Sequence, residues 1–282
     1  MDALVTTDWL AEALGAPDLR VIDATYYGSV PGGPDGDPAA DFAAAHIPGA
    51  AFLDLATLAD ATSDLPSTLP DAATFQARLR AIGVNGDDRI VLYDQSHYRT
   101  ASRAWWMLRT FGAERVAILD GGFAKWQREG RPTERGMPSP TPGDFTAAFD
   151  PRRLRTLDQI RATVANGAEQ ILDARSAARF SGVEPDPRPG TASGHMPGAK
   201  NLPYGQLFDA DGTWKRGDAL RTAFADAGID LARPLVTTCG SGITAAVLAF
   251  GAHLLGNEAA LYDGSWSEWG GDPTTPKATG DA

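Results

Sequence analysis

The stretch Val236-Thr237-Thr238-Cys239-Gly240-Ser241-Gly242-Ile243-Thr244-Ala245-Ala246 joins a β-branched run, a cysteine, a loop with two glycines and an apolar continuation. The β-branched run predicts a strand that ends at Cys239, and the apolar continuation predicts a helix that begins near Thr244. A strand followed by a loop and a helix is typical of α/β proteins with parallel sheets. Ligands of such sheets bind beyond the carboxyl ends of the strands, where Cys239 lies.

The loop after Cys239 has the composition of an anion-binding loop. Gly240 and Gly242 permit tight curvature and remove side chains that would block a bound anion. N–H groups at a helix start point inward, and the helix dipole adds partial positive charge there. Both features favour a thiolate at Cys239, and the same groups would stabilise a persulfide anion. Ser241 and Thr244 can add hydroxyl hydrogen bonds. The alternative, a buried cysteine that acts as a small hydrophobic residue, does not call for glycines at this junction.

The whole chain contains this kind of unit twice. Landmarks recur in the same order with slowly drifting offsets, which predicts a duplicated domain. The matching segments are 21–24 with 171–174, 46–50 with 195–199, 81–84 with 225–229, 90–94 with 235–239, and 119–126 with 262–269. Asp94 stands where the second copy has Cys239, so only the second copy has a thiol at this position.

Each copy alternates short apolar runs with helical stretches, which predicts a mostly parallel sheet with helices on both faces. The fold class is therefore α/β, with two tandem domains. We expect strands at 21–23, 90–93, 116–119, 171–173, 235–238 and 259–262. We expect helices at 71–82, 101–111, 217–227 and 244–255.

Proline content predicts the boundary between the copies. Five prolines between Arg131 and Pro151 indicate an extended linker over the surface. We expect an N-terminal domain at 1–130, a linker at 131–155 and a C-terminal domain with Cys239 at 156–270. The Gly-, Pro- and Thr-rich tail at 271–282 is expected to pack little.

The composition is that of a globular chain long enough for two domains, with 282 residues, of which 43% are hydrophobic and 22% charged. Lys and Arg number 25 against 36 Asp and Glu, so the net charge is −11. Because no basic cluster stands out, nucleic acid and anionic membranes are poor partners. The longest apolar stretch, 245–255, is shorter than the ~20 residues that span a bilayer, and the first residues lack a signal-peptide pattern. We expect a soluble cytoplasmic protein.

Cys239 is the single cysteine of the chain. This excludes an internal disulfide and a metal site built from several thiolates. We expect neither a metal nor a cofactor.

These motifs resemble those of the two-domain rhodanese superfamily. The resemblance covers nearly all of both repeats, including the paired His-x-Pro-Gly-Ala segments and the Asp-Gly-Ser-Trp-Ser-Glu-Trp run that ends at Trp269. The loop from Cys239 to Thr244 is similar to that of the 3-mercaptopyruvate sulfurtransferases, with Ile243 where the family often has Val. Such proteins have a catalytic C-terminal copy and a degenerate N-terminal copy, which fits Asp94.

The resemblance implies sulfur transfer by covalent catalysis. The Cys239 thiolate would attack the sulfur of 3-mercaptopyruvate, and pyruvate would leave as its enolate. The cysteine persulfide would then pass its outer sulfur to cyanide, a small thiol or a reduced thioredoxin.

The resemblance also implies the residues that contact the donor. Thiosulfate sulfurtransferases place basic residues directly after the cysteine, whereas Gly240 and Ser241 are neutral, so a donor with one carboxylate is favoured. Two arginines that bind the donor in the mercaptopyruvate family carry over to Arg179 and Arg188. With them we expect substrate contacts from the loop residues Gly240, Gly242, Ile243 and Thr244. Alternatively, Arg179 and Arg188 form surface ion pairs with Glu184 and Asp186. Arg175, close to Asp173, is expected to brace the fold by an ion pair.

An acid–base relay of serine, histidine and aspartate is a further implication of the resemblance. The nearest matches are Ser241, His46 and Asp37, and Asp41 competes with Asp37 for the last role. Together with Cys239 they form the expected catalytic set. However, His46 and His195 hold equivalent places in the repeat, which favours a structural role for both in the turn before Pro-Gly.

Three other functions can be weighed against this one. A thiosulfate:cyanide sulfurtransferase would use the same thiol with another donor. A cysteine phosphatase needs an arginine six residues after the cysteine, where this chain has Ala245, so that function is disfavoured. A non-catalytic rhodanese-like binding module often lacks the cysteine that this chain retains.

Overall fold

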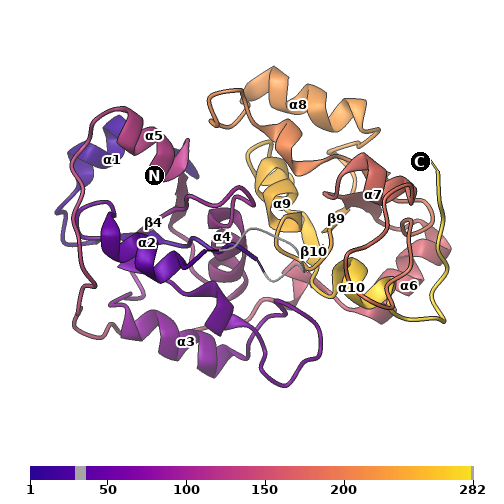
Figure 1. The fold of residues 1–282 in the computed structure, drawn as a ribbon, viewed down its shortest axis with the longest axis horizontal. Helices are drawn as coiled ribbons and strands as arrows, with labels where there is room; N and C mark the ends of the chain where they lie inside the picture. The colour runs from indigo at the N-terminus through magenta and orange to yellow at the C-terminus, as the bar shows by residue number, and fades with distance from the viewer. Residues whose placement is uncertain (29–35, 281–282) are drawn as a thin grey trace.

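Two α/β domains lie side by side in the computed structural model, which describes residues 1–28 and 36–280 (Figure 1). Each domain contains a five-stranded sheet, and every pair of neighbouring strands that the structure describes is parallel. The strand orders are β1-β5-β4-β2-β3 and β6-β10-β9-β7-β8, which are the same order in two copies. The predicted α/β duplication is therefore confirmed.

The elements of the two domains correspond closely. The N-terminal domain contains β1 (Leu4–Val5), α1 (Thr7–Ala13), β2 (Leu19–Asp23), α2 (Pro38–Ala44), β3 (Ala51–Phe52), η1 (Leu55–Leu58), α3 (Ala72–Ala81), β4 (Arg89–Tyr93), α4 (Ala101–Thr110), β5 (Val116–Leu119) and α5 (Gly122–Arg128). The C-terminal domain contains η2 (Pro151–Arg153), β6 (Leu154–Arg155), α6 (Leu157–Asn166), β7 (Gln170–Asp173), α7 (Ala177–Ser181), β8 (Lys200–Asn201), η3 (Tyr204–Leu207), α8 (Gly217–Asp226), β9 (Leu235–Thr238), α9 (Ala245–His253), β10 (Ala260–Tyr262) and α10 (Ser265–Trp269).

Side chains of the buried strands alternate between the two faces of each sheet. In β4, Ile90 and Leu92 pack on the face that carries α3 and α4, whereas Val91 and Tyr93 pack with α1, α2 and α5 on the other. In the C-terminal domain, α8 and α9 cover one face and α6, α7 and α10 cover the other. Because both faces are buried, these strands read as continuous apolar runs.

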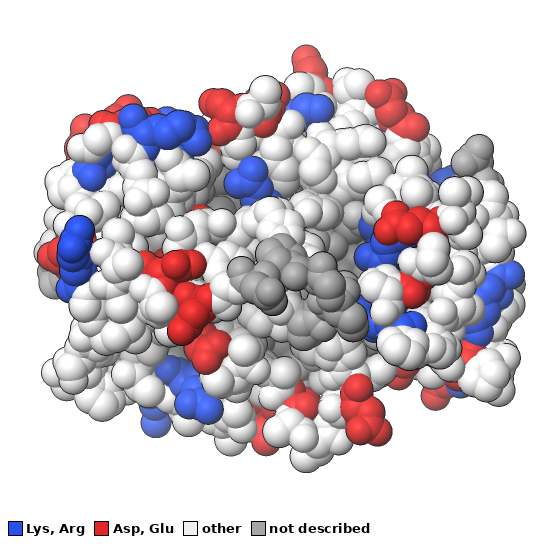
Figure 2. Space-filling view, viewed as in Figure 1, with Lys and Arg blue, Asp and Glu red and all other residues white. Residues whose placement is uncertain are grey.

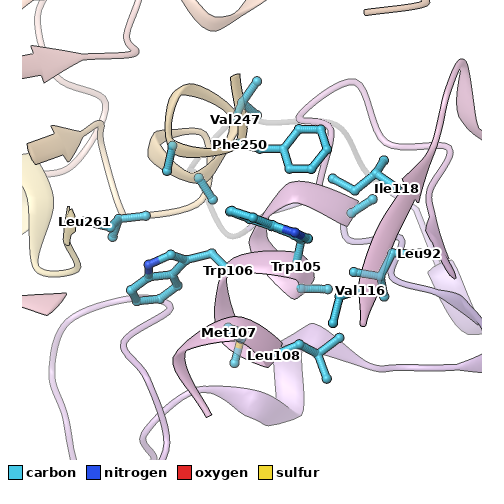
Figure 3. Close-up of a cluster of buried hydrophobic side chains, with 14 of the residues drawn as sticks. Leu92, Trp105, Trp106, Met107, Leu108, Val116, Ile118, Val247, Phe250 and Leu261 are labelled. Carbon is cyan, nitrogen blue, oxygen red and sulfur yellow. The ribbon is translucent and has the colours of Figure 1, made fainter. Parts of the chain in front are cut away.

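One hydrophobic core continues from the first domain into the second through α4 and α9. Trp105 on α4 meets Phe250 on α9 edge to face, with ring centroids 4.9 Å apart (Figure 3). Trp214 makes a similar contact with Phe250 at 4.9 Å. The carboxyl end of β9, which leads into Cys239, lies beside this interface between the domains.

The six longer strands match the sequence prediction to within two residues, and the four expected helices are present. The edge strands β1, β3, β6 and β8 were not predicted. Each contains two residues, which is too short to show a period of two.

The first residues of the expected linker still contact the first domain. Trp126 donates its indole N–H to the carbonyl of Pro132 at 2.7 Å, and Glu134 forms an antiparallel bridge with His46. Most side chains that follow, up to residue 144, are exposed. The C-terminal sheet then begins with β6 at Leu154, within the segment expected to be linker.

The tail packs against the C-terminal domain, and the expectation that it packs little is wrong for residues 271–280. Trp269 donates its indole N–H to the carbonyl of Pro276 at 2.8 Å, and Ala278 forms an antiparallel bridge with His195. The indole contact repeats that of Trp126 with Pro132, and the bridge repeats that of His46 with Glu134. In both copies a buried indole N–H needs an acceptor, and a proline carbonyl supplies it. The last two positions of the expected tail, 281 and 282, lie outside the described residues.

Among residues 1–28 and 36–280, none of the helices is both long and apolar enough to cross a bilayer. On the face drawn in Figure 2, Lys and Arg side chains are interspersed with Asp and Glu.

Candidate active site

Cys239 lies at the carboxyl end of β9 and lines a cavity of about 210 Å³ between the domains. The cysteine is only 2% exposed, so the cavity is its route to solvent. The second domain supplies residues from the Cys239 loop, from α7 and from the segment after it. The first domain supplies Tyr26, Gly28, Ser67 and Tyr98. The site is therefore built by both copies.

One amide of the loop points at the sulfur, and two of its carbonyls bind to α10. Gly242 donates its N–H to Cys239 Sγ at 3.1 Å. The carbonyls of Cys239 and Gly240 accept the N–H groups of Trp266 and Ser267, both at 2.9 Å, at the start of α10. Within the described residues, the amides of Gly240, Ser241, Ile243 and Thr244 donate to no protein group. Free amides at a helix start are suited to hold an anion.

The degenerate loop of the first domain shows such an anion in place. Asp94 occupies the position of Cys239, and its two carboxylate oxygens accept the N–H groups of Ser96 and Ala101, both at 2.8 Å. Ala101 begins α4 as Ala245 begins α9. Burial raises the pKa of Asp94 to about 6, against the lowering effect of these amides and of Arg99. The amides of this kind of loop therefore stabilise a negative charge at the position of the sulfur, whereas burial opposes that charge.

Two guanidinium groups face the loop across the cavity. Arg179, on α7, and Arg188 both pair with Asp186, whose side chain is 1% exposed. A Cβ placed on Gly240 would lie 3.3 Å from Arg188 Nη1 and 3.4 Å from Arg179 Nη2. Glycine at position 240 thus lets both arginines approach the loop. Arg179 Nε is buried and has no partner in the described residues.

Both arginines form the ion pairs with Asp186 that were expected as an alternative to donor binding, and both also line the cavity. Asp186 is a residue that sequence reasoning considered only as a surface partner. Its burial makes it an anchor that fixes both guanidinium groups at the cavity wall. Arg175 also lines the cavity, and it forms the expected ion pair with Asp173 at 2.7 Å and lies over the Trp266 ring at 4.4 Å.

No hydrogen bond or ion pair within the described residues joins Ser241, His46 and Asp37. Ser241 lines the cavity, whereas Asp37 lines a neighbouring cavity that shares Tyr26 and Gly28 with it, and His46 lines neither. His46 lies 2.9 Å from the carbonyl of Phe42 through Nδ1 and stacks on the Phe42 ring, with centroids 4.1 Å apart. His195 makes the same contacts with Phe180, at 2.9 and 3.9 Å. The duplicated histidines therefore fix equivalent turns.

The aspartates expected in the relay have local roles. Asp37 caps α2 by accepting the N–H groups of Ala39 and Ala40, both at 3.0 Å. Asp41 accepts the hydroxyl of Tyr27. Both carboxylates are thus engaged on the first domain.

Three tyrosines complete the cavity wall and were not singled out in the sequence. Tyr26 and Tyr98 come from the first domain, and Tyr204 begins η3 in the second. Tyr204 donates its hydroxyl to the carbonyl of His97 at 3.2 Å, and burial raises its pKa. No local motif marks these residues, because their proximity arises from docking of the two domains.

Within the described parts of the chain, three or more His, Cys, Asp or Glu side chains do not gather in a way that could hold a metal ion.

The fold and the site together define a class of protein. Residues 6–129 and 156–272 match the family model of the rhodanese-like domain, so the chain belongs to the rhodanese family. It is 42% identical over 273 residues to the 3-mercaptopyruvate sulfurtransferase of Escherichia coli K12, covering 96% of each chain. It is 36% identical over 299 residues to thiosulfate/3-mercaptopyruvate sulfurtransferase 1, mitochondrial, of Arabidopsis thaliana, covering 98% of this chain and 78% of the other. The crystal structure of SseA from Escherichia coli superposes with a TM-score of 0.85 at 40% identity, covering 95% of this chain and 100% of that one.

Proposed function

We propose that the protein is a sulfurtransferase that moves the sulfur of 3-mercaptopyruvate to an acceptor through a persulfide on Cys239. One observation carries this proposal: the thiol opens into a cavity where unpaired loop amides and two guanidinium groups meet. The thiol would accept the sulfur, the guanidinium groups would bind the donor, and the amides would stabilise the persulfide anion. The sequence similarity to 3-mercaptopyruvate sulfurtransferases supports the same donor.

In the first half-reaction, Arg179 and Arg188 hold the carboxylate and keto oxygens of the donor. A guanidinium offers two parallel N–H donors, and Asp186 fixes both groups before the donor arrives. The Cys239 thiolate attacks the donor sulfur, and the new S–S bond forms as the C–S bond breaks. The electron pair of the C–S bond stays on carbon, so pyruvate leaves as its enolate. The proton of the donor's thiol group, or one from solvent through the Ser241 hydroxyl, goes to the enolate carbon.

In the second half-reaction, the loop amides stabilise the persulfide anion until an acceptor arrives. The acceptor attacks the outer sulfur, the S–S bond breaks, and its electron pair returns to Cys239 as a thiolate. Holding the group between two substrates in this way is ping-pong catalysis. It needs no redox partner when the acceptor is cyanide or a thiol.

The measurement that tests the proposal is the mass of the intact protein before and after addition of 3-mercaptopyruvate. We expect a gain of one sulfur atom, located on Cys239, that cyanide removes. Cys239→Ser is the matched control and gains nothing. A wild-type protein whose mass does not change would overturn the proposal, and so would a gain retained by the control.

A thiosulfate donor is the second candidate, and the name of the Arabidopsis relative includes it. The neutral residues Gly240 and Ser241 favour 3-mercaptopyruvate, because thiosulfate carries a second negative charge that finds no cation on this loop. The ratio of kcat/KM for the two donors decides between them. A ratio that favours thiosulfate would reverse the assignment.

For the acceptor we propose a small thiol or a reduced thioredoxin, in the cytoplasm. The persulfide would lie in a cavity that opens between the domains, and a single cysteine is suited to a reducing compartment. Pyruvate release with thioredoxin kept reduced is the measurement. A rate no higher than that without thioredoxin would exclude it as the acceptor.

A further inference from the structure

Arg103 of the non-catalytic domain reaches into the catalytic loop of the other domain. It lies on α4 and is 2% exposed. Its Nη1 donates to Asp263 Oδ1 at 2.6 Å and to the carbonyl of Gly242 at 3.2 Å. Its Nη2 donates to the carbonyl of Ser67, and the guanidinium lies over the Trp106 ring at 4.6 Å. This side chain therefore joins three segments at one buried point.

Asp263 is fixed as firmly as Arg103. It directly follows β10, and its second oxygen accepts the N–H of Leu69 from the first domain at 2.6 Å. The ion pair is therefore held from both domains. Its position is set before any substrate binds.

Gly242 rests directly on this ion pair. A Cβ at position 242 would lie 2.8 Å from Asp263 Oδ1 and 3.1 Å from Arg103 Nη1. Its φ of +83° is in the left-handed region that favours glycine. A glycine has many alternative conformations, so its native one needs support from its neighbours. Arg103 supplies that support through the Gly242 carbonyl.

The N–H of the same residue donates to Cys239 Sγ at 3.1 Å. One glycine thus carries both contacts, with its carbonyl held by Arg103 and its N–H aimed at the reacting sulfur. We propose that Arg103 is a positioning residue, contributed by the non-catalytic domain, that keeps the Gly242 N–H on the sulfur of Cys239. This inference rests on the proposed function only in taking Cys239 as the nucleophile.

A comparison within the molecule separates this role from ordinary interface stabilisation. Arg216 also pairs across the domains, with Asp120 at 2.7 Å, but its side chain is 54% exposed and does not contact the Cys239 loop. The position on α9 that corresponds to Arg103, counted from the start of each helix, is Val247. Of these two equivalent helix positions, only that of Arg103 carries a buried cation, and this position contacts the Cys239 loop.

The experiment compares Arg103→Met and Arg103→Lys with Arg216→Met. The first measurement is the alkylation rate of Cys239 by iodoacetamide as a function of pH, which needs no sulfur donor. The second is kcat and KM with 3-mercaptopyruvate. For Arg103→Met we expect the alkylation profile to move to higher pH and kcat to fall on the order of 10-fold, because the N–H at the reacting sulfur is misplaced. KM should change less than kcat, since Arg179 and Arg188 remain.

Arg103→Lys keeps the charge beside Asp263 and should recover part of both losses. If Arg103→Met does not fold, Arg103→Lys alone tests the proposal. Its alkylation profile should then move to higher pH and its kcat should fall, both by less than expected for Arg103→Met. The proposal would be overturned if the Arg103 variants kept the alkylation profile and kcat of the wild-type protein. It would also be overturned if Arg216→Met changed both quantities as much as Arg103→Met does. Failure of sulfur transfer in the wild-type protein would instead refute the proposed function, and the alkylation contrast would still report on Arg103.

Discussion

Asp120 and Asp263 occupy equivalent positions after the last long strand of their domains, and each accepts a backbone N–H from the other domain. Asp120 binds the N–H of Trp214 at 2.8 Å, and Asp263 binds that of Leu69 at 2.6 Å. Each domain therefore extends a segment over the loop of its neighbour, at the catalytic site on one side and at the degenerate site on the other. The duplication therefore supplies residues of the first domain that cover the loop of Cys239.

The cavity can be tested at Gly240, where the loop approaches the arginines. Gly240→Ala places a methyl group 3.3–3.4 Å from both guanidinium groups, which must move by a few tenths of an ångström. We expect kcat/KM for 3-mercaptopyruvate to fall on the order of 10-fold, because the donor is then misaligned. Steady-state kinetics provide the measurement. Gly205→Ala is the matched control, since its new methyl group has no neighbour within 4 Å. Equal kinetics in the two variants would contradict this geometry.

Donor preference can be tested at Ser241, which lines the cavity beside Cys239. Ser241→Lys adds a positive charge that attracts doubly charged thiosulfate more than a singly charged donor. The ratio of kcat/KM for thiosulfate to that for 3-mercaptopyruvate should rise on the order of 10-fold. Ser241→Met has similar bulk without the charge and should leave the ratio near the wild-type value. A ratio that rises equally in both variants would trace preference to size rather than charge.

Much of the fold could be predicted from the sequence, because it depends on local patterns. Buried parallel strands give continuous β-branched runs, and the repeat doubles every such signal. The edge strands β1 and β6 have two residues each, and the tail is held by scattered contacts such as the Trp269 indole N–H, the bridge from Ala278 to His195 and the Gly280 N–H on the Ser181 carbonyl. Such contacts leave no periodic trace.

The sequence predicts the part of the site that lies within one continuous segment of the chain. Cys239 and its glycines form one motif, whereas Arg103 is 139 positions from its Gly242 acceptor. Docking of two domains, not a motif, creates that contact. The assignment of His46 shows the converse difficulty: a matching sequence position does not fix the direction of a side chain, and here Phe42 sets it.

The buried carboxylate of Asp94 makes stability depend on pH. Burial raises its pKa to about 6, above the usual value of 3.8. A raised pKa means that the folded state binds the proton more tightly, so this contribution is fully present below about pH 4 and is lost as pH rises through 6. Relative to Asp94→Asn, the wild-type protein should lose about 1–3 kcal/mol between pH 4 and pH 7. Denaturant unfolding of both proteins across this range provides the measurement. The exposed Asp218→Asn serves as the control, and a difference between wild type and Asp94→Asn that does not vary with pH would contradict the assignment.

The duplicated histidines predict equal losses of stability and no loss of chemistry. His46→Leu and His195→Leu each leave a carbonyl without its imidazole partner, that of Phe42 in one case and that of Phe180 in the other. Both variants should lose about 1–3 kcal/mol of unfolding free energy, because a buried acceptor becomes unsatisfied. Turnover per folded molecule, and its dependence on pH, should match the wild type in both. The measurements are denaturant unfolding and kcat corrected for the folded fraction. If His46→Leu alone lost turnover or changed the pH profile, His46 would act on the reaction, and the equivalence of the two turns would no longer describe its role.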